Sequence, residues 1–237
     1  MKKQQNLFFD LFKECPIPDN ELLLNLGLFI KRQDLSRLLY LDYLYRKIIN
    51  VHGIVMEFGT RWGQNLALFS SFRGMYEPFN HNRKVVGFDT FKGFPSIHKK
   101  DGKSDATSVG AYTTTKKYEK YLKKILDCHE QESPLSSIKK HEVIKGDASL
   151  QINKFLKDNP ETIIALAYFD LDLYEPTKKC LEAIKKHLTK GSVIGFDELN
   201  VGCFPGETLA LKEVFGLDKY KITRSPYNPL QSFVVIE

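Results

Sequence analysis

Acidic residues recur directly after short apolar runs in this chain. Carboxylates brought together in this way can accept hydrogen bonds from a bound ligand, take up a proton or coordinate a divalent cation. Each acid taken singly could equally cap a helix or lie at the surface. Whether these acids form a functional site therefore depends on whether the fold brings them together. The acids in question are Asp89, Asp147, Asp170, Asp172, Asp197 and Glu198.

The apolar runs themselves are typical of buried β-strands. They are Ile54–Phe58, Val85–Phe88, Val143–Ile144, Ile163–Phe169, Val193–Phe196 and Phe233–Ile236. Uninterrupted apolarity favours strands covered on both faces, as in a parallel sheet. Amphipathic stretches between them predict helices at 64–75, 115–128, 149–157, 176–188 and 207–215. This alternation predicts an α/β, doubly wound, Rossmann-like fold, in which the carboxyl ends of the strands share one edge.

The first 50 residues have a different pattern. Apolar residues at 22–26 and 38–44 recur at helical spacing, and the strand rhythm begins only after His52-Gly53. We therefore expect an N-terminal helical segment at 1–50 and one ligand-binding domain at 51–237. The apolar surface of the helical segment could also support a homo-oligomer.

Composition excludes several classes of protein. Apolar residues make up 42% and charged residues 27% of the 237, as in a soluble globular chain. No run approaches the ~20 apolar residues of a membrane span. The four cysteines are scattered, which favours reduced thiols and a cytoplasmic location. The net charge is +6, but the lysine clusters lack regularly interleaved aromatic residues and a nucleic-acid motif, so no nucleic-acid partner is expected.

The first predicted strand continues into a glycine turn. Gly59 and Gly63 precede a predicted helix, and such a turn presents backbone N–H groups to a ligand at the sheet edge. Asp89 follows about 30 residues later, which loosely matches the acid that binds ribose hydroxyls in nucleotide-binding folds. A turn aspartate explains Asp89 alone equally well. The third strand also ends in an acid, Asp147, and Asp89 and Asp147 together with the glycine turn indicate an adenosine-type cofactor.

Four segments carry a resemblance to a known family. They are Met56–Gly63, Gly87–Pro95, Asp170–Thr177 and Asp197–Asn200. The chain resembles class I S-adenosylmethionine-dependent methyltransferases, in particular the macrocin O-methyltransferase-like family, over residues 50–237. The resemblance implies a seven-stranded, mainly parallel sheet with helices on both faces, an antiparallel last strand, and S-adenosylmethionine as the cofactor.

The same resemblance assigns the cofactor-binding residues. It places Glu57, Gly59 and Gly63 against the methionine part, Asp89 at the ribose hydroxyls and Asp147 near the adenine amino group. The remaining residues that it assigns to the cofactor are Phe58, Thr60, Thr90, Gly146 and Asp170.

The acids after the fourth and fifth strands indicate a cation. Four carboxylates at one edge repel one another unless protons or a cation compensate, and oxygen ligands suit Mg²⁺. The resemblance implies Mg²⁺ held by Asp170, Asp197 and Glu198, with Asp172 as general base beside Asp170 at the catalytic centre. Two residues depart from the family pattern: Glu198 stands where aspartate is expected, and Arg61 where many members have glycine.

The predicted activity is therefore Mg²⁺-dependent transfer of a methyl group to a hydroxyl of a small-molecule acceptor, a sugar or another small polyol. Two alternatives remain at this point. Nucleotide-sugar glycosyltransferases also bind a divalent cation through a D-x-D pair such as Asp170 and Asp172. A Rossmann-like binding domain without catalytic activity is the second alternative.

Overall fold

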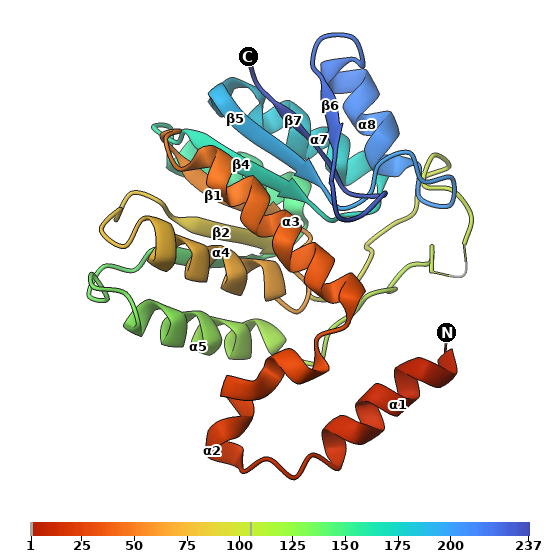
Figure 1. Ribbon diagram of the computed structural model, residues 1–237. Helices are drawn as coiled ribbons and strands as arrows, with labels where there is room; N and C mark the ends of the chain where they lie inside the picture. Colours follow the sequence, from red (N-terminus) through yellow and green to blue (C-terminus); the bar gives the residue numbers. More distant parts are fainter. Residues whose placement is uncertain (1, 105) are drawn as a thin grey trace.

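Seven strands form one sheet in the computed structural model, which describes residues 2–104 and 106–237 (Figure 1). The strand order is β3-β2-β1-β4-β5-β7-β6, and β7 runs antiparallel to both of its neighbours while the other pairs are parallel. This confirms the predicted fold class and the antiparallel last strand. The strands are β1 (Ile54–Phe58), β2 (Val85–Asp89), β3 (His141–Lys145), β4 (Ile164–Phe169), β5 (Leu188–Phe196), β6 (Ile222–Arg224) and β7 (Ser232–Val235).

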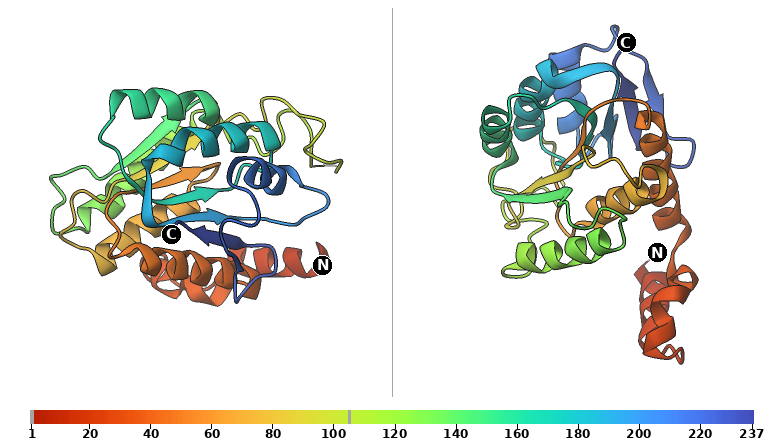
Figure 2. Two further views of the ribbon diagram at one scale, coloured as in Figure 1. Left: turned by 90° about the horizontal axis from the view of Figure 1, so that it is seen from above. Right: turned by 90° about the vertical axis from the view of Figure 1, so that its left-hand side faces the viewer.

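Helices cover both faces of the sheet. One face carries α3, α4 and α5, and the other carries α6, α7 and α8, which gives three layers (Figures 1 and 2). Among the described residues, no helix is both long and apolar enough to span a membrane. The helices are α1 (Lys2–Lys13), α2 (Asp19–Leu22), α3 (Arg32–Ile48), α4 (Gln64–Tyr76), α5 (Tyr118–Gln131), α6 (Ala148–Asp158), α7 (Tyr174–Ile184) and α8 (Gly206–Phe215), with 3-10 turns η1 (Leu23–Phe29) and η2 (Lys185–His187).

Some predicted boundaries were wrong. The helix predicted at 176–188 begins at Tyr174, and Leu188 already belongs to β5. Strand β6 was not predicted because it has only three residues and contains no apolar run. It forms a strand by pairing with β7 at the edge of the sheet. Pairing with a neighbouring strand, and not the local sequence pattern, therefore determines that these residues form a strand.

A row of phenylalanines crosses the sheet at the ends of its central strands. Phe58 is in register with Phe88 on β2 and with Phe169 on β4, which is in turn in register with Phe196 on β5. The rings stack with centroids 4.7–5.5 Å apart, and all four are fully buried. The four phenylalanines are in register near the carboxyl ends of their strands. The row therefore holds these four strand ends at one level.

The N-terminal segment has two parts. Helix α3 packs on the sheet, and its residues Tyr40, Leu41, Leu44 and Tyr45 are fully buried. Helices α1 and α2 extend away from the sheet (Figure 2), and Leu23 and Leu24 of η1 are 76% and 85% exposed. Helix α3 thus belongs to the core that supports the strand ends.

Candidate active site

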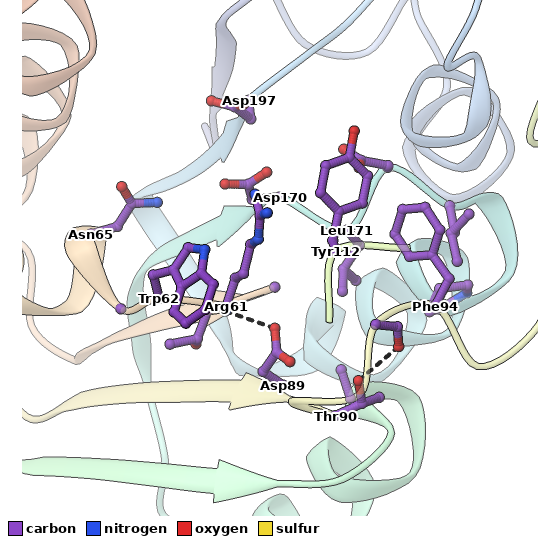
Figure 3. Close-up of a pocket in the computed structure, with 18 of the residues that line it drawn as sticks. Arg61, Trp62, Asn65, Asp89, Thr90, Phe94, Tyr112, Asp170, Leu171 and Asp197 are labelled. Carbon is purple, nitrogen blue, oxygen red and sulfur yellow. Dashed lines mark hydrogen bonds between the residues drawn. The ribbon is translucent and has the colours of Figure 1, made fainter. Parts of the chain in front are cut away.

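A cavity of about 430 Å³ opens at the carboxyl ends of β1, β2, β4 and β5 (Figure 3). Ligands of open α/β sheets bind at this edge. The cavity brings together ten of the residues that the sequence singled out: Gly59, Thr60, Gly63, Asp89, Thr90, Asp147, Asp170, Asp172, Asp197 and Glu198. Most of the chemistry-bearing residues therefore surround one space.

Three other predicted residues lie beneath or beside the cavity. Glu57 is buried, and this burial together with Asp170 raises its pKa well above the ordinary value. The side chain of Phe58 belongs to the phenylalanine row, and its carbonyl accepts the Asp170 N–H at 2.8 Å. Gly146 donates its N–H to the backbone carbonyl of Asp89 at 2.8 Å. These three residues support the walls of the site.

The glycine turn after β1 passes very close to the end of β4. Gly59 has φ +94°, and a Cβ placed on it would lie 1.9 Å from the carbonyl oxygen of Asp170. Only glycine fits such a position. Gly63, at φ +78°, starts α4, whose N-terminus faces the cavity with the turn. The two glycines thus allow backbone to line the cavity where side chains would fill it.

Asp89 holds two loops together at the bottom of the view in Figure 3. Its carboxylate accepts the N–H of Arg61 at 2.7 Å and that of Phe91 at 2.5 Å. Burial raises the pKa of Asp89, and these N–H groups oppose the shift. Asp147 has a different local role, because its carboxylate caps α6 by accepting the N–H of Ser149 at 2.9 Å.

Arg61 and Trp62, which the sequence left without a role, form one wall of the cavity (Figure 3). The Arg61 guanidinium lies 4.8 Å from the ring centre of Tyr112 and 5.8 Å from that of Trp62. Trp62 packs edge-on against Tyr118 at 4.7 Å. The sequence predicted the polar stretch 96–114 as a lid over the reacting centre, but it did not single out Tyr112 because the stretch has no periodicity.

Acids on the chemistry side of the cavity retain protons more strongly than usual. Burial and Asp197 raise the pKa of Asp170 and that of Asp172 above the ordinary value, and Arg37 opposes both shifts. Burial and Asp172 raise the pKa of Glu198 to about 8. Like charges in a partly dry site disfavour full ionisation.

Glu207 binds the backbone of the loop between Asp170 and Asp172. Its carboxylate accepts the N–H of Leu171 at 2.9 Å and that of Asp172 at 3.3 Å. Glu207 is fully buried, and Asp172 has φ +61°, a conformation that non-glycine residues rarely adopt. The loop is therefore held in a fixed conformation by a buried acid at the start of α8.

Arg37 on α3 lies between the acids of β4 and β5. Its Nη2 is 2.5 Å from the Asp170 carboxylate, and its Nη1 is 2.9 Å from that of Asp197. Burial lowers the pKa of Arg37, but Tyr168, Asp170 and Asp197 together raise it above the ordinary value. Sequence reasoning missed Arg37, since no motif marks an arginine so far along the chain from its partners.

The residues present do not fit the predicted divalent ion in this arrangement. Among residues 2–104 and 106–237, no three His, Cys, Asp or Glu side chains lie together as a metal site. The guanidinium of Arg37 already lies between Asp170 and Asp197. The metal ligand set Asp170, Asp197 and Glu198 therefore stays a prediction.

The fold is shared with O-methyltransferases of known structure. The O-methyltransferase NovP superposes with a TM-score of 0.58 at 16% identity, over 85% of this chain and 80% of NovP. An O-methyltransferase from Bacillus cereus, solved in complex with S-adenosylhomocysteine, superposes with a TM-score of 0.52 at 13% identity, over 98% of this chain and 97% of that one. At such identities the likeness concerns the fold.

A much closer likeness links the chain to CalS11, described as a calicheamicin methyltransferase. The two are 41% identical with a TM-score of 0.96, over 99% of this chain and 91% of CalS11. The protein therefore belongs to the class I S-adenosylmethionine-dependent methyltransferases, and it is an enzyme of that class. A second structure, of apo CalS11, matches at 40% identity and a TM-score of 0.87. CalS11 is a TDP-rhamnose 3'-O-methyltransferase of calicheamicin biosynthesis.

No protein-family model and no curated protein sequence matches the chain. Membership of the class rests on the likeness to CalS11, and it sets aside the glycosyltransferase and non-catalytic alternatives.

Proposed function

We propose that this protein transfers a methyl group from S-adenosylmethionine to a hydroxyl of a sugar, carried by a nucleotide as in TDP-rhamnose. The observation that carries the proposal is a single cavity in which the glycine turn and Asp89 adjoin Asp170 and Asp172. The likeness to CalS11 supports the choice of acceptor class. A cytoplasmic location and a homo-oligomer stay predictions.

The cofactor half of the cavity suits an adenosine and a positive charge. Asp89 is the proposed acceptor of the ribose hydroxyls, and Gly59, Thr60 and Gly63 the turn beside the methionine part, with Phe58, Thr90, Gly146 and Asp147 around the nucleoside. When bound, S-adenosylmethionine supplies the methyl group from a positively charged sulfur. Carboxylates around the cavity favour that charge over the neutral sulfide left after transfer.

The acceptor half provides the base. Asp172 is the proposed group that takes the hydroxyl proton as the oxygen forms its bond to the methyl carbon and the methyl–sulfur bond breaks. Burial and Asp197 raise the pKa of Asp172 above the ordinary value, which makes it a stronger base than an exposed aspartate. Glu207 holds the Asp172 backbone and so fixes the direction of its side chain.

The test compares binding with turnover. Isothermal titration should show S-adenosylmethionine binding to the native protein, and mass spectrometry should show TDP-rhamnose gaining one methyl group. Asp89→Ala should weaken cofactor binding about 10- to 100-fold, as expected for lost charge-assisted hydrogen bonds. Asp172→Asn should keep cofactor affinity and lower turnover about 10²- to 10⁴-fold.

Asp158→Asn, at the exposed end of α6, is the matched control and should change neither quantity. A native protein that binds S-adenosylmethionine but leaves TDP-rhamnose unmethylated would disprove the proposed acceptor. An Asp172→Asn enzyme with native turnover would remove Asp172 as the base.

A further inference from the structure

The acids at the end of β4 and β5 need a positive charge, and the fold supplies one from its own chain. We propose that Arg37 takes the place of a divalent cation between Asp170 and Asp197, so that methyl transfer in this protein needs no metal ion. The functional part of this inference rests on the proposed function. The charge placement itself rests on geometry alone.

The contacts of Arg37 are those of a bridging cation. Its two terminal nitrogens reach one carboxylate each, Asp170 at 2.5 Å and Asp197 at 2.9 Å, while its Nε lies 3.4 Å from the amide oxygen of Asn65. A guanidinium is planar and permanently charged, and its fork matches paired carboxylates. One side chain thus compensates acids from two neighbouring strands.

The partners of Asp197 also favour the guanidinium over a metal ion. Besides Arg37, its carboxylate accepts the hydroxyl hydrogen of Tyr168 at 2.9 Å and an amide hydrogen of Gln231 at 2.9 Å. Tyr168 and Gln231 both donate to Oδ1 of Asp197 and Arg37 donates to Oδ2, so a metal ion could coordinate this carboxylate only in competition with the guanidinium. An entering metal ion would have to displace Arg37 and compete with two further hydrogen bonds.

Arg37 is also held in place by the element that carries it. One turn further along α3, Tyr40 and Leu41 are fully buried, and the Tyr40 hydroxyl donates to the carbonyl of Ser232 at 2.7 Å. Helix α3 is therefore fixed against the sheet one turn after Arg37. Displacing the guanidinium requires a rotamer change into the cavity, because the helix itself cannot withdraw without opening the core.

The remaining N–H groups of Arg37 are available to a substrate in the cavity. A guanidinium has five N–H groups, and the contacts to Asp170, Asp197 and Asn65 use three of them. The side chain is 27% exposed and lines the cavity together with Asp172. The free N–H groups are placed to donate to the acceptor oxygen, which would orient that oxygen toward the methyl group while Asp172 takes its proton.

The decisive experiment measures metal binding apart from catalysis. Native protein is titrated with Mn²⁺ and free Mn²⁺ is followed by electron paramagnetic resonance; we expect no binding tighter than the millimolar range. Arg37→Met, which keeps an unbranched side chain and removes the charge, should bind Mn²⁺ at least about tenfold more tightly, since it exposes two uncompensated carboxylates. The gain should vanish in Arg37→Met/Asp170→Asn.

Several results would overturn the inference. They are micromolar Mn²⁺ binding by the native protein that Asp170→Asn abolishes, an Arg37→Met variant that binds Mn²⁺ no better than native, or native turnover of TDP-rhamnose that falls tenfold with chelator and returns with Mg²⁺. Arg46→Met is the matched control on α3, since Arg46 pairs with Asp42 at an exposed position. The titration decides about Arg37 even if the proposed acceptor is wrong.

Discussion

Single residues at this site are constrained more by the backbone around them than by their own chemistry. Arg61, Asp172 and Phe91 all have positive φ, and each lies in a loop that lines or adjoins the cavity. Strained positions of this kind persist only where surrounding contacts hold them, and they cluster at functional sites. The cavity is therefore built in advance of any ligand.

Gly59 gives a direct test at this scale. Gly59→Ala should lower the free energy of unfolding by about 3 kcal/mol or more, because its Cβ would meet the Asp170 carbonyl and its φ is positive. Gly74→Ala, in α4 with no atom within 4 Å of the added carbon, should raise it by about 0.5–1 kcal/mol. Urea unfolding measures both, and equal stabilities would contradict the steric argument.

At the scale of elements, the sequence predicted residues that belong to a local pattern. It missed residues whose position depends on how helices and strands pack together. An apolar run followed by an acid is a local pattern, so Asp89, Asp170 and Asp197 could be identified as strand-end residues. Arg37 could not, because its meeting with Asp170 depends on how α3 crosses the sheet. The stretch 96–114 likewise shows no pattern, since its anchors are side-chain contacts to distant helices.

Asp101 is the main anchor of that stretch. Its buried carboxylate accepts the N–H of Tyr174 at the start of α7 and that of His98, both at 2.6 Å. Asp101→Ala should free the stretch and destabilise the protein by about 1–3 kcal/mol, the cost of unsatisfied buried donors. Limited chymotrypsin digestion should then cleave after Tyr112 several-fold faster.

Lys103→Ala, at an exposed position of the same stretch, is the control and should digest at the native rate. Cleavage of Asp101→Ala at the native rate would show that the stretch is held by other contacts.

For the whole molecule, acid stability depends on a buried histidine at the start of β3. Burial, helped by Lys139, lowers the pKa of His141 to about 4, although Asp127 and Glu130 oppose the shift. The unfolded chain binds a proton on this histidine near pH 6.5, while the folded chain does so only near pH 4. Protonation therefore favours unfolding, and stability is lost as the pH falls through this window.

Removing the titrating group should flatten that dependence. His141→Gln should lose about 1–3 kcal/mol less than native protein between pH 6.5 and pH 4, measured by urea unfolding at several pH values. His52→Gln, at an exposed position, should follow the native curve. A native-like slope in His141→Gln would assign the acid sensitivity to other groups.

The phenylalanine row has a consequence for how such an enzyme can diversify. It holds the ends of β2, β1, β4 and β5 at one level, yet the loops that follow β1 and β2 face the proposed cofactor while those that follow β4 and β5 face the proposed acceptor. Because Gly59 meets the residue after β4 only through the backbone of Asp170, side-chain substitutions after β4 and β5 can accumulate without moving the turn at Gly59. A lineage of this architecture can change the hydroxyl that it modifies while every intermediate still binds its methyl donor.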